Sequence, residues 1–242
     1  VSSLSSVNGR LRRRNEDCGY RNDETGLYAV ADGIGGAPGG NVASALAMES
    51  FETEGKALNS VSKPWTRDAL ETMLTRMNNY ILDYGNRHRN YRGLGTTFTG
   101  LVIESSEKWW LLHAGDSRLY GLGKTAVRQI TIDQTLKTER IRMGLSSESK
   151  SWHVHENHML TNYLGSKSFY SEIQVIRPRD YCCFLLCTDG LSKSIERDRL
   201  QKMIQPDIDD PEIMCTKLID VARSAGSSDD ITVLAIVLQE RN

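Results

Sequence analysis

Short apolar runs bounded by glycine and polar residues recur along the chain and predict its β-strands. The run LYAVAD, residues 27–32, stops at a glycine-rich stretch, as a buried strand entering a tight loop does. Four closely spaced runs follow Gly95, and the short gaps between them favour an antiparallel meander because parallel strands need longer crossovers. These runs are TTFTGLVIE, KWWLLHAG, SRLYGLG and TAVRQITI, and the later runs EIQVIR, YCCFLLCTD and ITVLAIVL predict further strands.

Other segments carry the pattern of helices. Residues 41–58 are rich in alanine, methionine and glutamate, and residues 65–88 place apolar side chains at helical spacing. Lys63-Pro64 separates the two, since proline is tolerated at a helix start but not in its interior. A third helix is expected over residues 211–224, after DIDDP, whereas the polar residues 135–170 predict an irregular surface excursion.

Strands and helices are segregated along the chain rather than strictly alternating, which favours an α+β fold with mainly antiparallel sheets. The last run, ITVLAIVL, is apolar at consecutive positions, so we expect it to be covered on both faces. Helices packed outside two sheets would cover it in this way. The length of 242 residues and the apolar content of 39% fit one domain over residues 1–242.

Charge and cysteine content limit the cellular compartment and the binding partners that can be expected for this protein. Lysine and arginine number 30 and aspartate and glutamate 31, so no global field attracts nucleic acid or an anionic membrane. No apolar run approaches the length of a membrane span. The 5 cysteines, three of them within residues 182–187, do not form the spaced framework of a secreted scaffold. We therefore expect a cytoplasmic protein that binds no nucleic acid and inserts into no membrane. We also expect a monomer.

Acidic residues stand at or beside the predicted strand ends in several places. Each one alone is typical of a turn. Strand ends of a layered fold can converge, however, and carboxylates brought together need a cation because like charges and burial penalise their ionised forms. Oxygen ligands without Cys and His at zinc-like spacing favour Mg²⁺ or Mn²⁺. The stretches are RRRNED (Glu16, Asp17), VADGIGG (Asp32), HAGDSRLY (Asp116), CTDGLS (Asp189) and SSDDITV (Asp229, Asp230).

The glycines beside Asp32 fit a metal site, since the carbonyl of Gly33 can approach an ion where no side chain intervenes. A carboxylate site with two metals is suited to hydrolysing phosphate esters, because the ions lower the pKa of a bridging water and orient it for in-line attack. An arginine would complete such a site by binding phosphate oxygens bidentately. Four arginines precede Asn15-Glu16-Asp17, namely Arg10, Arg12, Arg13 and Arg14.

In order and over essentially the whole chain, these motifs resemble those of the PP2C (PPM) family of metal-dependent protein serine/threonine phosphatases. The resemblance implies a four-layer αββα fold, in which a β-sandwich is flanked by helices. The compact length and the first motif are similar to bacterial stand-alone members, which implies a phosphatase that reverses a bacterial Ser/Thr kinase. The matching stretches are R-x-x-N-E-D at 12–17, V-A-D-G-x-G-G at 30–36, G-T-T at 95–97, A-G-D-S-R at 114–118, T-D-G-L at 188–191 and D-D-I-T-V at 229–233.

Carried over position by position, the resemblance implies two Mn²⁺ or Mg²⁺ ions bridged by Asp32. Glu16 and the carbonyl of Gly33 would bind one ion. Asp189 and Asp229 would bind the other.

The resemblance assigns further roles around that centre. Asp17 would orient metal-bound water, and Arg12 would bind the substrate phosphate. Asp116 would hold a third, weaker ion together with Asp189. Residues from about 133 to 164 correspond to the variable flap that lies beside the family's active site.

Some positions depart from the family pattern. Ile34 stands where certain members have a histidine proposed to protonate the leaving alcohol, so another group supplies that proton or the role goes unfilled. Asp230 stands where asparagine is usual, which leaves Asp230 as an alternative to its neighbour Asp229. The flap stretches DQTLKTERIRMG and HENHMLTNYLG also differ, so substrate recognition does not carry over.

Competing interpretations exist for the basic residues and for one cysteine. The arginine cluster has no interleaved aromatic residues, so a nucleic-acid patch is disfavoured, and a solvated strand face is the simpler interpretation of Arg10, Arg13 and Arg14. Cys187 is not followed by a phosphate-cradling loop that ends in arginine, so we expect a buried strand cysteine and no cysteine-dependent phosphatase.

Three histidines and two adjacent tryptophans also have simple structural interpretations. His153, His155 and His158 lie in a polar, irregular segment and are expected at the surface rather than on a metal. Trp109 and Trp110 are adjacent in a predicted strand, so one is expected on each face.

Two function classes remain. The first is an active phosphatase that hydrolyses phosphoserine and phosphothreonine by direct attack of a metal-activated water. The second is a non-catalytic phosphatase-like module that binds a kinase or a phosphoprotein. Such a degenerate module would be expected to have lost metal carboxylates, and all are present, which favours the enzyme.

Overall fold

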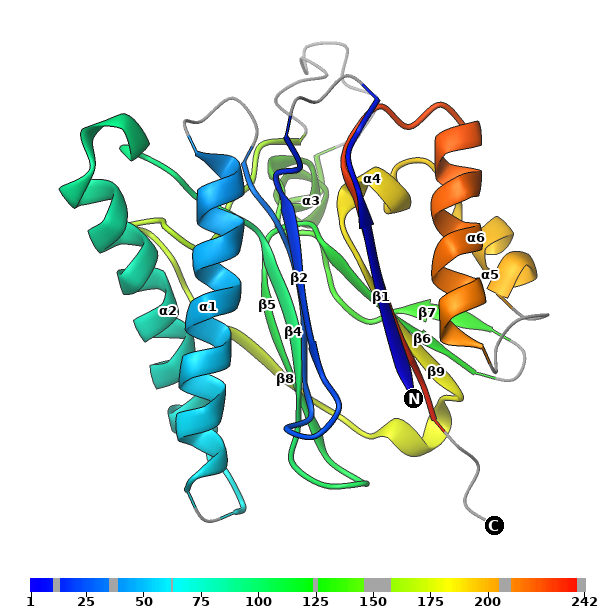
Figure 1. The fold of residues 1–242 in the computed structure, drawn as a ribbon, viewed down its shortest axis with the longest axis horizontal. Helices are drawn as coiled ribbons and strands as arrows, with labels where there is room; N and C mark the ends of the chain where they lie inside the picture. The colour runs from blue at the N-terminus through cyan, green and yellow to red at the C-terminus, as the bar shows by residue number, and fades with distance from the viewer. Residues whose placement is uncertain are drawn as a thin grey trace.

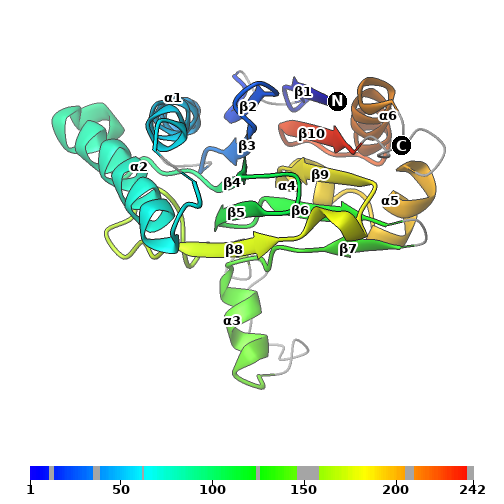
Figure 2. The same ribbon diagram turned by 90° about the horizontal axis from the view of Figure 1, so that it is seen from below.

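Two five-stranded sheets packed face to face form the centre of the structure, a computed structural model that describes residues 1–10, 14–34, 39–61, 63–123, 126–145, 158–204 and 210–238. Helices cover the outer face of each sheet, so the layers follow one another as α, β, β and α (Figure 2). This arrangement confirms the predicted α+β sandwich.

Both sheets are antiparallel throughout. The first contains β1 (Ser2–Val7), β10 (Ile231–Val237), β9 (Cys183–Cys187), β6 (Arg118–Leu122) and β7 (Val127–Gln129), in that spatial order. The second contains β2 (Asp17–Asn22), β3 (Leu27–Asp32), β4 (Phe98–Ile103), β5 (Trp109–Ala114) and β8 (Glu172–Ile176). Every residue of β10 is buried, as its apolar pattern predicts.

The helices expected over residues 41–58, 65–88 and 211–224 are present, and a further helix, over residues 197–204, was not predicted. They are α1 (Gly40–Asn59) and α2 (Arg67–Arg87) on the second sheet, with α5 (Arg197–Ile204) and α6 (Pro211–Ser224) on the first; shorter elements are η1 (Arg89–Tyr91), α3 (Leu136–Arg142), η3 (Pro178–Asp180) and α4 (Asp189–Ser192). Side-chain caps fix the starts of two helices. The Thr66 hydroxyl accepts a hydrogen bond from Ala69 N at 3.2 Å at the start of α2, and Asp210 caps α6, whose first residue is proline.

Three apolar clusters hold the layers together. One lies between α1, α2 and the second sheet, one between the two sheets, and one between the first sheet and α5 with α6. The adjacent tryptophans divide between them, because Trp110 packs in the helix-facing cluster and Trp109 in the cluster between the sheets. This confirms the prediction that they occupy opposite faces of one strand.

The predicted four-strand meander is wrong at its centre. β4 pairs with β5 and β6 pairs with β7, but β5 and β6 belong to different sheets. The chain crosses between the sheets at Gly115, whose φ of 107° lies in the region that favours glycine. The polar turn carrying Asp116 therefore sits where the sheets meet rather than in a hairpin.

β1 is a strand that its own composition does not predict. It reads SSLSSV, yet it pairs along its whole length with buried β10, from Ser2 opposite Ile236 to Val7 opposite Ile231. Arg10 and Arg14 are exposed but lie in the loop after β1, which corrects the expectation of a strand face. The ladder ends because the Gly9 amide bonds the Asp230 side chain instead of a strand neighbour.

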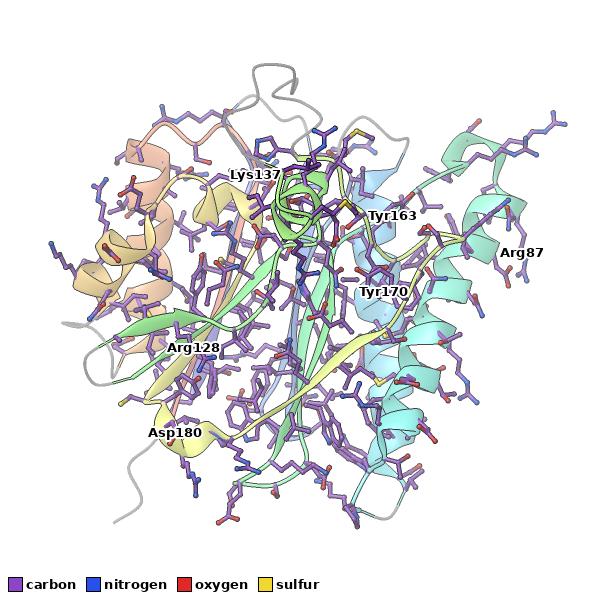
Figure 3. The ribbon with its side chains drawn as sticks, turned by 180° about the vertical axis from the view of Figure 1, so that it is seen from behind. Arg87, Arg128, Lys137, Tyr163, Tyr170 and Asp180 are labelled. Carbon is purple, nitrogen blue, oxygen red and sulfur yellow. The ribbon has the colours of Figure 1, made fainter. Side chains whose placement is uncertain are left out.

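The expected surface excursion contains a helix. α3 has no buried residue and projects from the body of the molecule (Figure 2), and Figure 3 shows Lys137 on it. His158 is exposed, as expected, whereas His153 and His155 lie outside the described residues. Within the described ranges, no helix is both long enough and apolar enough to cross a bilayer.

Candidate active site

The acidic strand ends of the second sheet meet those of the first at one end of the sandwich, where α4 lies (Figure 1). Asp17 begins β2 and stands opposite Asp32, which ends β3. Thr188, at the end of β9, donates a 2.7 Å hydrogen bond to Oδ2 of Asp17 and so joins the two sheets. Asp189 follows directly and begins α4. Convergence of these three carboxylates, far apart in sequence, is the arrangement that the motifs predict.

The remaining acidic residues arrive through the strand register. Residues 118 and 233 both pair with Cys187, so the turn before β6 and the loop before β10 lie on either side of the end of β9. Asp116 occupies the first of these positions and Asp229 and Asp230 the second.

Threonines of the G-T-T motif hold the backbone of Asp32. The amide of Asp32 donates to Oγ1 of Thr97 at 2.9 Å, and its carbonyl accepts from Oγ1 of Thr96 at 2.8 Å. Oγ1 of Thr97 also lies 2.6 Å from the hydroxyl of Ser117, beside Asp116. The motif therefore fixes the relative position of two acidic segments.

The cluster is electrostatically unfavourable by itself. Burial, followed by the charges of Asp189 and Asp17, raises the pKa of Asp32 well above its usual value. Burial, offset in part by the Thr188 hydrogen bond, raises the pKa of Asp17 to about 7. Burial and the charge of Asp189 likewise raise the pKa of Asp116 to about 7. Such a set of carboxylates calls for positive charge.

Two buried carboxylate oxygens indicate where a cation would fit. Oδ1 of Asp17 and Oδ1 of Asp189 accept no hydrogen bond within the described part of the chain. In those same ranges, no three His, Cys, Asp or Glu side chains already surround one point closely enough to hold an ion. The donor set nevertheless fits a divalent cation, since it consists of oxygens, is rich in charge and leaves buried acceptors unused.

Glycines make room beside this cluster. A Cβ on Gly33 would lie 2.1 Å from the carbonyl oxygen of Gly40, at the start of α1. A Cβ on Gly40 would in turn lie 3.0 Å from Oε1 of Glu16 and 3.1 Å from the carbonyl carbon of Gly33. The Glu16 carboxylate and the Gly33 carbonyl thus flank one glycine Cα, as expected if both approach one ion.

The two neighbouring aspartates before β10 have different surroundings. Oδ1 of Asp230 accepts from Gly9 N at 2.7 Å, and Oδ2 accepts from Glu16 N at 2.8 Å. Its side chain is buried, and both of its oxygens hold backbone in place. Asp229 is less buried and accepts from the amide of Asp230 at 3.0 Å. This geometry supports Asp229 rather than Asp230 as the metal ligand.

Two residues of this region lie outside the predicted site residues. Lys193, the residue after α4, forms an ion pair with Asp189 and lies 3.9 Å from Oδ2 of Asp116. Gln134 accepts from Gly115 N at 2.8 Å and donates to Glu172 Oε2 at 2.6 Å. The i, i+4 spacing of Asp189 and Lys193 could have indicated that ion pair from the sequence. The contacts of Gln134 could not, because they join segments that are distant in sequence.

The predicted phosphate arginine, Arg12, lies outside the described residues. Ile34 is described, and its amide donates to Gly95 O at 3.0 Å. A Cβ on Gly95 would touch the side chains of Ile34 and Tyr163, so the position after Gly33 has an apolar surrounding. Nothing in that contact replaces the missing histidine.

A buried cysteine and a cavity lie outside this carboxylate cluster and do not contribute to it. Cys187 is buried, and burial raises the pKa of its thiol to about 12, which confirms a structural cysteine. A cavity of about 400 Å³, lined by residues including Arg128 and Asp180, lies at the end of the sandwich away from α3 (Figure 3). None of the acidic strand-end residues is among its described lining residues.

The chain is similar to named bacterial phosphatases over nearly its full length. It is 29% identical over 245 residues to the serine/threonine phosphatase stp of Listeria welshimeri, covering 97% of this chain and 93% of that protein. It is also 29% identical over 259 residues to the protein phosphatase PhpP of Streptococcus pneumoniae, covering 100% and 98%.

Solved structures agree with the fold. Stp1 from Staphylococcus aureus superposes with a TM-score of 0.88 at 21% identity, covering 99% of this chain and 95% of that one. The catalytic domain of PstP in complex with two manganese ions gives 0.83 at 26%, covering 99% and 98%. The model of the protein phosphatase 2C family matches residues 13–212. The chain therefore belongs to the protein phosphatase 2C family.

Proposed function

We propose that this chain is a phosphoprotein phosphatase that hydrolyses phosphoserine and phosphothreonine at a centre of two divalent ions, Mn²⁺ or Mg²⁺. The observation that carries the proposal is the convergence of carboxylates around Asp32, with unused buried oxygens on Asp17 and Asp189. Membership of the protein phosphatase 2C family and similarity to named Ser/Thr phosphatases support it.

In this proposal Asp32 would help to hold both ions. Glu16 and the Gly33 carbonyl, which flank Gly40, would help to hold one ion. Asp189 and Asp229 would help to hold the other. When bound, the ions would lower the pKa of a water and supply the nucleophile for attack on phosphorus.

The chain's own groups would orient that water and the substrate. Thr188 occupies Oδ2 of Asp17, which leaves Oδ1 of Asp17 to accept a hydrogen bond from the water. Arg12 is proposed to bind the phosphate with its planar guanidinium. With Ile34 after Gly33, the proton of the leaving alcohol would come from water or from another group, or the role would go unfilled.

The substrates, the opposing enzyme and the cellular location are also part of the proposal. The substrates are phosphorylated proteins, and a bacterial Ser/Thr kinase is the opposing enzyme. We propose a cytoplasmic monomer, with residues of about 133–164 acting as a flap that influences substrate choice. A third, weaker ion near Asp116 was also expected, and the geometry there supports a positive charge beside Asp116.

Hydrolysis of a phosphothreonine peptide tests the function. We expect activity with Mn²⁺, its loss with EDTA and its loss in Asp32→Asn. Asp83→Asn, at an exposed carboxylate of α2, is the matched control and should keep full activity. Activity that survives both chelation and Asp32→Asn contradicts the two-metal centre. A well-folded wild type that binds a phosphoprotein but hydrolyses none would favour the non-catalytic module.

Arg12→Ala tests the phosphate contact separately. A residue that binds the substrate phosphate should raise KM more than it lowers kcat when it is removed. An unchanged KM removes Arg12 from the site.

A further inference from the structure

A lysine ammonium lies within the carboxylate cluster. Nζ of Lys193 contacts Oδ2 of Asp189 at ion-pair distance and lies 3.9 Å from Oδ2 of Asp116. The side chain is 43% exposed, whereas those of Asp116 and Asp189 are 9% and 12% exposed. The charged end of Lys193 therefore reaches inward between two buried acids.

Local geometry fixes this position. α4 is a single turn that begins at Asp189, and the amide of Lys193 donates to the Asp189 carbonyl at 2.8 Å. Residues four apart lie one above the other on a helical turn, so the lysine stem runs back along the turn to the carboxylate at its start. Asp116 arrives independently, from the crossing between β5 and β6.

The arginine nearest in sequence to Asp116 is paired with another acid. Arg118, two residues after Asp116, donates to both carboxylate oxygens of Asp133, at 2.8 and 2.6 Å. Over the described ranges, Lys193 is the basic side chain that forms ion pairs with the cluster of Asp17, Asp32, Asp116 and Asp189.

We propose that Lys193 is a resident cation that occupies the Asp116 side of the centre and takes the place of a third metal ion there. The inference rests on the proposed two-ion centre and concerns how many ions it holds. Asp116 and Asp189 would otherwise present oxygen ligands to a further divalent ion. An ammonium that hydrogen-bonds Oδ2 of Asp189 and lies near Oδ2 of Asp116 repels such an ion and offsets the negative charge of both carboxylates.

The consequence is a chain that needs two divalent ions rather than three. The charge that a weakly held third ion would supply is built into the polypeptide and does not depend on free metal concentration. Asp116 then acts with Lys193 as an ion pair, not as a metal ligand.

Counting bound Mn²⁺ tests the inference without relying on activity. Equilibrium dialysis and calorimetric titration should give two ions for the wild type. Lys193→Gln should gain a third, weaker ion, and the double variant Lys193→Gln with Asp116→Asn should return to two. Lys193→Arg, which keeps the charge, should also bind two. Lys202→Gln, which removes an exposed lysine of α5, is the matched control for net charge and should bind two ions.

Thermal unfolding in EDTA gives a second readout. At pH 8, Lys193→Gln should lower the Tm by about 3 °C or more relative to Lys202→Gln, because the acids lose their counter-charge. Equal ion counts in the wild type and in Lys193→Gln overturn the inference. A wild type that binds no Mn²⁺ overturns the proposed metal centre instead, and the inference falls with it.

Discussion

The Thr188 hydroxyl donates a 2.7 Å hydrogen bond to Oδ2 of Asp17, tying the end of β9 in one sheet to the start of β2 in the other. Oγ1 of Thr188 also accepts from the amide of Thr232 at 3.0 Å. One buried hydroxyl therefore connects three strands and orients a carboxylate of the proposed active site.

Thr188→Val should lower phosphatase activity by about tenfold to a hundredfold, because a hydrogen bond to a charged group contributes about 1.5–3 kcal/mol. Thr188→Ser keeps the hydroxyl and should retain most activity. Thr25→Val removes a buried hydroxyl that has no hydrogen-bond partner among the described residues, and serves as the control. Equal activity in Thr188→Val and Thr25→Val would show that the contact does not matter.

The two aspartates before β10 should separate stability from metal binding. Asp230→Asn leaves fewer acceptor positions for the amides of Gly9 and Glu16, so unfolding in EDTA should become easier by roughly 1–3 kcal/mol. Asp229→Asn should instead weaken Mn²⁺ binding while leaving the metal-free protein at least as stable. Thermal unfolding and Mn²⁺ titration measure the two effects, and the reverse pattern would make Asp230 the ligand.

The metal-free protein should lose stability as pH rises. The pKa of Asp17 is raised to about 7 in the folded state and is near 3.8 in the unfolded chain, so the folded state binds more protons between these values. Stability contributed by the protonated group is full below about pH 4 and is lost as pH rises through about 7. Unfolding in EDTA at pH 5.5 and pH 8 measures the slope. Asp17→Asn should reduce the slope without abolishing it, because the pKa values of Asp32 and Asp116 are also raised, and an unchanged slope in that variant would refute the raised pKa of Asp17.

Gly33→Ala should damage both fold and site. A Cβ there would lie 2.1 Å from the Gly40 carbonyl oxygen, so the start of α1 must move away from the end of β3. Overpacking of this kind costs typically about 1–3 kcal/mol, and Mn²⁺ affinity should fall with it. Gly123→Ala is the control, because its new methyl would meet no atom closer than 3.5 Å. Similar melting temperatures and Mn²⁺ affinities for the two variants would contradict the close approach.

Several elements were predictable because their signals are local. The helix over Pro211–Ser224 has its cap, its proline and its apolar spacing in consecutive residues, and the structure begins and ends it at those positions. The division of Trp109 and Trp110 between two cores follows from strand alternation alone.

The strand predictions were wrong where a strand pairs with one that is distant in sequence. β1 forms a strand because it pairs with β10, more than 200 residues away, and the stretch SSLSSV has no apolar pattern that predicts a strand. The prediction of a four-strand meander was wrong because a short loop allows β5 and β6 to pair but does not require them to pair. The chain crosses to the other sheet at Gly115 because β6 pairs with β9, which belongs to that sheet.

For the candidate site, residue order alone shows which acids stand at strand ends, which glycines accompany them and which family the motifs resemble. The folded chain is needed to see that Asp230 holds the backbone of Gly9 and Glu16, that Thr188 orients Asp17 and that Lys193 lies beside Asp116. Residue type and spacing set what a side chain can do, whereas hydrogen bonds and ion pairs between distant segments form only when the sheets bring those segments within a few ångströms.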